Sequence, residues 1–396
     1  MAEEYPNYSF YDGYYYVNFS DIFIPKDVLI NDYWSMFIWG SGIYGQLGTG
    51  ETNSKSTPVT TFLGVSNWKD ISLGDTHTAA VKTDGTLWTW GENGSSGRLG
   101  IDATDAYKLT PVTTFAGGTD WKQVSCGYQY TAAIKTDGTL WLWGTNTSQE
   151  LGIKDAAGVK LTPVTTFAGG NDWKQVSCGD LHTAAIKTDG SLWVWGSGAS
   201  GRLGTNSTVD KSTPVTTFAG GNNWKQVSCG EAYIAAIKTD GSLWVWGLNA
   251  TCQLGTNNTA NGSTPVTTFA GGNNWKQVSC GTDHTAAIKA DGSLWVWGLN
   301  ATCQLGTNNT ANGSTPVTTF AGGNNWRRVS CGNGFTTAIK TDGSLWTWGK
   351  NNLGQLGVND AVNRSTPVTT FAGGINWKNL SCGGSHATAT IYLSDY

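Results

Sequence analysis

The sequence predicts an all-β fold, a seven-bladed β-propeller built from four-stranded antiparallel blades. Two observations predict it: one unit of 51 to 53 residues is repeated along the chain, and each copy contains four short strand-like segments. Apolar residues do not recur every 3.6 positions, which excludes a helical solenoid. The repeats are marked by a Trp-Gly pair at Trp39, Trp90, Trp143, Trp195, Trp246, Trp297 and Trp348.

The copy that begins at Trp224 shows the four segments. Its first segment reads Trp-Lys-Gln-Val-Ser-Cys-Gly. The second and third are joined by Asp240-Gly241, and this pair favours a tight hairpin because a type I′ turn needs positive φ at both central residues. The third segment places Trp244 and Trp246 two positions apart, so both indoles lie on one face of the strand. The fourth begins near Pro265, whose missing N–H fits an outer edge strand.

The phase of the repeat predicts how the ring closes. The chain enters with a third strand at residues 36–40 and a fourth at 57–62. It ends with a first strand at 378–383 and a second at 386–393. The propeller is expected to comprise residues 34–396. Its last blade should combine strands from both termini, which leaves no unpaired edge inside the ring.

Residues 1–33 lie outside the repeat and form an aromatic-rich N-terminal arm. Two interpretations stay open: the arm covers its own propeller, or it docks onto a partner or another subunit. The side chains expected to dock are Tyr11, Tyr14, Tyr15, Tyr16, Phe19 and Phe23.

The His, Asp and Cys residues that could act in catalysis or metal binding can each be explained by a structural role. The four histidines are about 100 residues apart, in equivalent turns of alternate blades, and each Asp-Gly carboxylate is explained by its hairpin. No catalytic or phosphate-binding motif is present. We therefore expect no enzyme activity, no cofactor and no metal site. Six cysteines share one slot of the repeat and are expected to be buried free thiols: Cys126, Cys178, Cys229, Cys280, Cys331 and Cys382.

Composition narrows the partners. The net charge is −4, and the sequence contains no basic cluster larger than Arg327-Arg328, so nucleic-acid binding is not expected. No apolar run is long enough to span a membrane, and the N-terminus has no secretory signal.

The repeated motifs resemble those of the regulator of chromosome condensation repeat family. The resemblance covers residues 34–393 and rests on Ser-Cys-Gly, Ala-Ala-Ile-Lys-Thr-Asp-Gly, Leu-Trp-Val-Trp-Gly and Gly-Gln-Leu-Gly. It implies a seven-bladed propeller and, for the founding members, guanine-nucleotide exchange through the channel face and a wedge from one blade. Every unit here is 51 to 53 residues long, so no insertion could supply that wedge.

Two nearly identical copies, which begin at Trp224 and Trp275, differ mainly at residues 231–234 and 282–285. This turn joins the first and second strands at one mouth of the channel. We expect it to form a partner-binding rim; the alternative is that its His and aromatic residues cap the turn from within. The rim residues are Asp75, His77, Tyr128, Tyr130, Asp180, His182, Glu231, Tyr233, Asp283, His284, Asn333, Phe335 and His386.

The main functional hypothesis is a non-enzymatic binding protein, a virion or phage-tail component or adhesin assembled in a host cytoplasm. Its partner is expected to be a protein held by the arm and the propeller face, with a glycan as a further ligand. The alternative is a cytoplasmic protein, either a guanine-nucleotide exchange factor or an intracellular scaffold of the regulator of chromosome condensation type.

Overall fold

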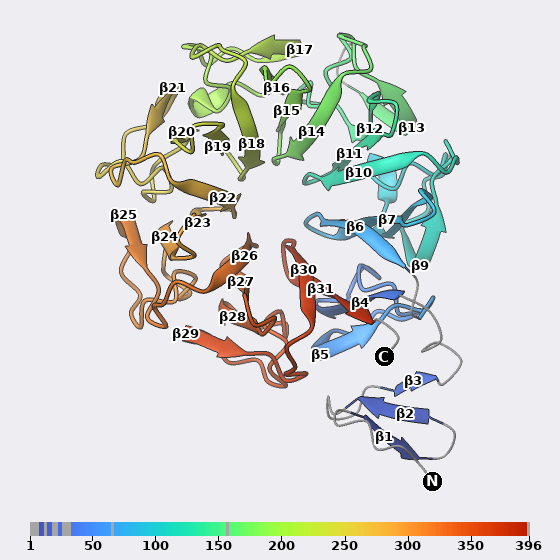
Figure 1. Ribbon diagram of the computed structural model, residues 1–396. Helices are drawn as coiled ribbons and strands as arrows, with labels where there is room; N and C mark the ends of the chain where they lie inside the picture. Colours follow the sequence, from blue (N-terminus) through green and yellow to red (C-terminus); the bar gives the residue numbers. More distant parts are fainter. Residues whose placement is uncertain are drawn as a thin grey trace.

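The computed structural model describes residues 8–11, 14–17, 23–25, 33–64, 67–155 and 158–393. Within these residues, seven four-stranded antiparallel sheets surround a central axis, as Figure 1 shows. The predicted seven-bladed propeller is confirmed. In each blade the first strand lies next to the axis and the fourth lies on the periphery.

The first four blades are continuous in sequence. Blade 1 contains β6 (Trp68–Leu73), β7 (His77–Lys82), β8 (Leu87–Glu92) and β9 (Tyr107–Thr113). Blade 2 contains β10 (Trp121–Cys126), β11 (Tyr130–Lys135), β12 (Leu140–Thr145) and β13 (Val159–Thr165). Blade 3 contains β14 (Trp173–Cys178), β15 (His182–Lys187), β16 (Leu192–Gly196) and β17 (Lys211–Thr216). Blade 4 contains β18 (Trp224–Cys229), β19 (Tyr233–Lys238), β20 (Leu243–Gly247) and β21 (Gly262–Thr267).

Blades 5 and 6 repeat this arrangement, and blade 7 closes the ring. Blade 5 contains β22 (Trp275–Cys280), β23 (His284–Lys289), β24 (Leu294–Gly298) and β25 (Gly313–Thr318). Blade 6 contains β26 (Trp326–Cys331), β27 (Phe335–Lys340), β28 (Leu345–Gly349) and β29 (Arg364–Thr369). Blade 7 contains β30 (Trp377–Cys382), β31 (His386–Leu393), β4 (Tyr33–Gly40) and β5 (Lys55–Thr60).

Blade 7 is the predicted composite of both chain ends. β31 pairs with β4 along its whole length, with Ala387 opposite Trp39 and Ala389 opposite Phe37. A C-terminal second strand therefore meets an N-terminal third strand in the register that β19 and β20 have inside blade 4.

The hydrophobic core lies between the blades. In blade 4, Trp246 is fully buried, and its cluster joins Ile186 and Val194 of blade 3 to Trp224 and Ile234 of blade 4. The equivalent indoles of the other blades are also fully buried: Trp39, Trp90, Trp143, Trp195, Trp297 and Trp348.

In blades 2 to 6, three indoles pack edge to face. In blade 4 the Trp224 ring centroid lies 6.3 Å from that of Trp244 and 6.1 Å from that of Trp246. The Lys238 ammonium covers the partly exposed end of this group, 4.4 Å from the Trp244 centroid. The small second-strand side chains Ala235 and Ala236 are also fully buried, in the clusters on the two faces of this blade.

A polar contact joins each blade to the next. The Trp246 indole N–H donates to the Arg202 carbonyl, 3.0 Å away, in the loop that follows the third strand of blade 3. Gly204 of the same loop has a φ of +62°, and a Cβ there would lie 2.7 Å from the Trp246 indole nitrogen. The Gly-x-Leu-Gly motif therefore provides both an acceptor carbonyl and a flat surface for the neighbouring indole.

The N-terminal arm contains a separate three-stranded antiparallel sheet. Its strands are β1 (Tyr8–Tyr11), β2 (Tyr14–Val17) and β3 (Phe23–Pro25), in the order β1-β2-β3. Figure 1 draws this sheet outside the outline of the ring. Five predicted docking residues lie in these strands, whereas Phe19 lies outside the described residues. Whether the arm docks onto a partner stays a prediction.

Helical structure is scarce in the part of the chain that the structure describes. It consists of two short 3₁₀ turns, η2 (Gly94–Ser96) and η3 (Ala199–Gly201), in loops that follow third strands. None of the described helices has the length and apolar character that a membrane crossing requires.

We predict that Trp246→Ala lowers the free energy of unfolding by about 3 to 5 kcal/mol, because it leaves a large cavity between two blades. Trp244→Ala, in the same strand, is the matched control and should cost less because Trp244 is partly exposed. Chemical denaturation monitored by circular dichroism measures both. Equal losses for the two variants would contradict an inter-blade core centred on Trp246.

Candidate functional site

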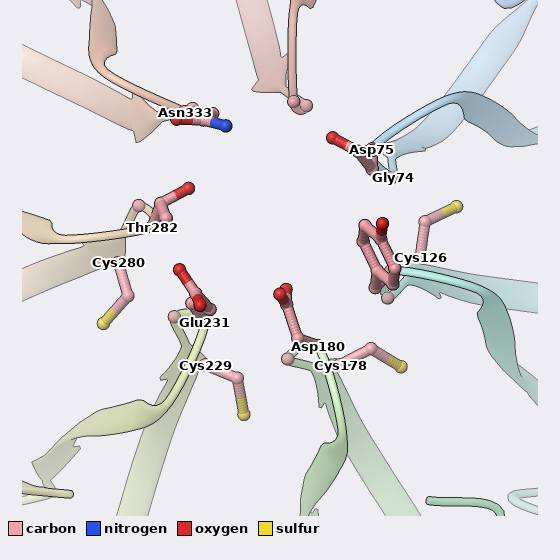
Figure 2. A pocket seen from close by; sticks show the side chains of 18 of the residues that line it. Gly74, Asp75, Cys126, Cys178, Asp180, Cys229, Glu231, Cys280, Thr282 and Asn333 are labelled. Carbon is pink, nitrogen blue, oxygen red and sulfur yellow. The ribbon is translucent and has the colours of Figure 1, made fainter. Parts of the chain in front are cut away.

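The turns after the seven first strands converge on one mouth of the central channel, shown in Figure 2. They enclose a cavity of about 360 Å³, to which six blades contribute a Cys-Gly-x sequence and blade 1 contributes Leu73-Gly74-Asp75. We call this opening the acidic mouth. The third residues of the turns are Asp75, Tyr128, Asp180, Glu231, Thr282, Asn333 and Gly384.

Three of these seven residues carry carboxylates, and none of the seven is a cation. Figure 2 shows Asp75, Asp180 and Glu231 pointing toward its centre. Burial raises the pKa of Asp180 to about 7, with a further increase from the charge of Glu231. Burial also raises the pKa of Glu231, and the nearby Asp283 carboxylate adds to this effect. Each of these groups would be stabilised in its charged form by a cation brought to the mouth.

Two buried arginines partly balance this charge. The Arg98 Nη1 donates to a Glu92 carboxylate oxygen at 3.0 Å, and its charge opposes the rise in the Asp75 pKa. Arg202 has the same effect on Asp180 and Glu231. These two arginines were not among the site residues predicted from the sequence. The sequence feature that could have identified them is that Arg replaces the commoner Gln of the Gly-x-Leu-Gly loop in two copies.

The Cys-Gly pair shapes the wall of the mouth. The Cys229 N–H donates to the Ser177 hydroxyl of blade 3 at 3.0 Å, and its thiol donates to the Ser177 carbonyl at 3.2 Å. A Cβ on Gly230 would lie 2.1 Å from the Tyr233 ring, so this position excludes any side chain. The thiols labelled in Figure 2 point away from the opening.

All eight cysteines are free thiols. The prediction of buried free thiols in the repeat slot is confirmed for Cys126, Cys178, Cys229, Cys280 and Cys331, whereas Cys382 is half-buried. Burial raises the pKa of Cys178 to about 12 and that of Cys382 to about 11, so these thiols are protonated and unreactive at neutral pH.

At the first residue of each second strand, the structure supports the alternative of capping from within over a partner-binding rim. These side chains are fully buried because each one reaches across to the next blade. The Tyr130 hydroxyl, for example, donates to the His182 carbonyl at 2.5 Å and accepts from the Thr183 hydroxyl at 3.0 Å. The buried residues are His77, Tyr130, His182, Tyr233, His284, Phe335 and His386.

Three histidines in this slot, His77, His284 and His386, make a similar contact with a threonine hydroxyl of the next blade. His182 makes no such bond, because Ile234 takes the place of that threonine in blade 4. The His284 Nε2 lies 2.8 Å from the Thr336 hydroxyl oxygen, and that hydroxyl donates its single proton to the Gln304 carbonyl. The imidazole must therefore donate from Nε2. Burial lowers the pKa of His182, His284 and His386 to about 3, so these rings are neutral. This geometry supports capping of the turn from within.

The remaining predicted rim residues do lie at the mouth. Asp75, Asp180, Glu231 and Asn333 line it, and Tyr128 is 43% exposed. Asp283 follows Thr282 in the blade 5 turn and is half-buried. In the described part of the chain, no three His, Cys, Asp or Glu side chains are grouped so that they could hold a metal ion.

Comparisons with known proteins agree with this architecture. A family model described as the RCC1-like domain matches residues 122–392. A model of the regulator of chromosome condensation (RCC1) repeat matches residues 35–81 and 84–134, and a second repeat model matches residues 68–97.

Individual proteins are similar over most of the chain. The ultraviolet-B receptor UVR8 of Arabidopsis thaliana is 31% identical over 335 residues, which cover 83% of this chain and 76% of the receptor. The serine/threonine-protein kinase Nek9 of Xenopus laevis is 29% identical over 388 residues, which cover 90% of this chain but 40% of the kinase. The solved structure of yeast RCC1 (Prp20) bound to Kap60 has a TM-score of 0.77 at 20% identity, with 92% of this chain and 90% of that chain covered.

We predict that His182→Tyr removes one source of acid sensitivity. Unfolded His182 binds a proton below its ordinary pKa of 6.5, whereas the folded side chain resists protonation until about pH 3. Stability from the neutral side chain is therefore present above pH 6.5 and is lost as the pH falls toward 3. Between pH 7 and pH 5 the wild type should lose about 2 kcal/mol more than the variant.

Chemical denaturation at the two pH values measures this difference. Tyr233→His is the converse control and should add a similar acid-dependent loss, because residue 233 occupies the same slot in blade 4. Identical pH dependence of the wild type and His182→Tyr would contradict the neutral buried imidazole.

Proposed function

Because this chain belongs to the regulator of chromosome condensation (RCC1) repeat family, we propose that it is a non-enzymatic interaction platform of that type. The ring acts as a rigid scaffold, and the acidic mouth binds a positively charged segment of a protein partner. The proposal assigns recognition to side chains of the site rather than to the fold, since one fold serves many functions.

The observation that carries this proposal is the variation at the mouth between copies that are otherwise alike. Glu231 in blade 4 corresponds to Thr282 in blade 5, although the two copies share their first and third strands. Inter-blade packing explains the buried Tyr233 and His284, but it does not require any particular residue at 231 or 282. Residues that the fold leaves free to vary around a cavity are suited to reading a partner.

The electrostatics favour a cationic partner segment. Asp180 and Glu231 have raised pKa values because they are partly buried close to other carboxylates. A Lys or Arg side chain placed among them would relieve that repulsion. The exposed ring of Tyr128 adds an aromatic surface at the same opening, and such residues often contribute much of the binding energy.

The comparisons support the scaffold alternative better than the virion or adhesin hypothesis. They match a plant receptor, a vertebrate kinase and a yeast RCC1 protein, and none of these names indicates a virion component. A cytoplasmic location accompanies the scaffold alternative. Guanine-nucleotide exchange is the second activity to test, and membership of the family is what favours it.

The arm contributes a second attachment site, supported by its own sheet outside the propeller repeat. No observation at the acidic mouth favours a glycan over a protein, so the proposal names a protein alone.

We predict that Asp180→Asn combined with Glu231→Gln abolishes partner capture without unfolding the ring. Both substitutions remove negative charge from the acidic mouth, and removal of their mutual repulsion should not destabilise the protein. The measurement is affinity capture from the source cells followed by identification of the bound proteins. A partner that persists with the double variant would exclude the acidic mouth as its binding site.

A charge-matched control is Asp105→Asn with Asp155→Asn. These two carboxylates lie in exposed loops after the third strands of blades 1 and 2, where they pair with Lys108 of β9 and Lys160 of β13. The control should keep the partner, and a thermal melt should show that both variants are folded. The captured partner also decides between scaffold and exchange factor, because a small GTPase whose nucleotide release is accelerated would identify the latter.

We predict that a chain beginning at Trp34 folds but captures the partner less efficiently. The ring is complete without residues 1–33, apart from the pairing of Tyr33 with Leu393. The measurement compares partner recovery and thermal midpoint with those of the full chain. Unchanged recovery together with a lowered midpoint would show instead that the arm covers the propeller.

A further inference from the structure

The opposite mouth of the channel gathers positive charge from several blades. First strands begin there, and the residue after the opening Trp is Lys or Arg in all seven copies. Four of these cations, together with Arg328, line a cavity of about 610 Å³ that contains no carboxylate. We call this opening the basic mouth. Its lining cations are Lys225, Lys276, Arg327, Arg328 and Lys378, and the equivalent positions of blades 1 to 3 hold Lys69, Lys122 and Lys174.

These cations are not neutralised within the ring. In the part of the chain that the structure describes, none of the five lining cations forms an ion pair. Arg327 donates to the Trp377 carbonyl at 2.6 Å, a contact with backbone that leaves its charge unbalanced. Each of the three lysines follows a buried Trp; Lys225 and Lys276 are exposed, and Lys378 is half-buried.

Arg328 is the most informative member of this group. Its position in the repeat is Gln in blades 2 to 5, where the amide holds the next blade: Gln226 donates to the Val278 carbonyl at 2.9 Å and accepts from the Val278 N–H at 3.1 Å. The Arg328 side chain makes no such hydrogen bond to any described residue. The Arg328 side chain is exposed at the basic mouth. Desolvation and the charge of Arg327 lower its pKa, so a nearby anion would stabilise the guanidinium.

The surroundings of the basic mouth favour a compact anion over an extended one. The hairpin turns between second and third strands lie on the same face, because the Trp275 N–H at the start of β22 donates to the Gly241 carbonyl at 2.9 Å. Each turn carries an exposed carboxylate, such as Asp240, whose pKa is lowered by the Ser242 hydroxyl and N–H. A polyanion lying across this face would meet these charges, whereas one held inside the mouth would not.

We propose that the basic mouth binds a compact anion with several phosphate groups. Arg guanidinium groups match phosphate oxygens in bidentate geometry, and the lysines add positive charge from several directions around the axis. The inference is independent of the partner proposed for the acidic mouth. The site is not visible as a cluster in the sequence, because cations about 51 residues apart come together only when the ring closes.

Isothermal titration calorimetry of the full chain with inorganic tripolyphosphate tests the proposal. We expect saturable binding of one ligand per chain at about 0.1 M salt. Binding should weaken markedly at about 1 M salt, where the Debye length falls from about 10 Å to about 3 Å. Absence of saturable binding at the lower salt concentration would overturn the proposal.

The variant Lys276→Gln with Arg328→Gln should weaken the binding by about tenfold or more, because two charge-assisted contacts are lost. Arg328→Gln introduces the residue that blades 2 to 5 already carry, so the fold should tolerate it. Lys225→Gln with Lys276→Gln provides a second test that leaves Arg328 in place. The charge-matched control is Lys108→Gln with Lys160→Gln, on the outer strands β9 and β13.

Tripolyphosphate affinity should be unchanged in this control. Equal weakening in the control and in the basic-mouth variants would mean that only net charge matters, and the site would be rejected. A single-stranded oligonucleotide and a glutamate-rich peptide serve as competing probes. If either binds more tightly than tripolyphosphate and loses affinity in Lys276→Gln with Arg328→Gln, the ligand is an extended polymer and the compact-anion proposal is wrong.

Discussion

The contact between a third-strand Trp and the preceding blade determines how this ring is assembled. One carbonyl of blade 4, that of Gln253, accepts from two donors of blade 5: the Trp297 indole at 2.9 Å and the Thr285 hydroxyl at 2.8 Å. The neighbouring Gly255 has no side chain to separate the indole from the loop. Because the partner always comes from the adjacent blade, no blade can bury its own Trp, and the sheets are stable only as a closed ring. The composite blade 7 follows from the same requirement, since Trp39 donates to the Gln355 carbonyl of blade 6.

The inter-blade contacts also decide which positions are available for function. In the turns at the acidic mouth, residues two positions apart lie in different environments. In blade 3, for example, Asp180 lines the opening, whereas His182 is buried against the next blade. The buried member must fill a fixed space and reach the neighbour, as Tyr130 does through its hydroxyl. The exposed member carries no such requirement. A rigid framework thus surrounds a small set of residues that can change without affecting the fold.

The sequence predicted the fold because its signals are repeated seven times. Period, hairpin turns and the phase of the two chain ends together gave the blade count and the composite blade, and the register of Ala387 with Trp39 confirms the closure. The rim was only partly predictable. His284 and Tyr233 resemble binding residues in sequence, and only the packing of adjacent blades reveals their structural role. The arm's aromatic residues did not indicate the strands β1 to β3, because that sheet lies outside the repeat.

The cationic mouth was hidden for a related reason. Sequence clustering detects neighbours along the chain, but a propeller brings equivalent positions together around its axis. All first strands run in the same direction along the channel wall. A residue type that recurs at the start of each first strand is therefore gathered at one mouth, and one that recurs at each end is gathered at the other. Lys or Arg recurs at every start, whereas the residues at the ends differ, as with Tyr128 and Asp180. One mouth therefore offers a cation from every blade, with the Asp70 carboxylate beside Lys69 on the blade 1 side. A compact anion held on the side of blades 4 to 7 meets positive charge alone. The other mouth offers an asymmetric set of carboxylate and aromatic groups, which can select a single orientation of one partner.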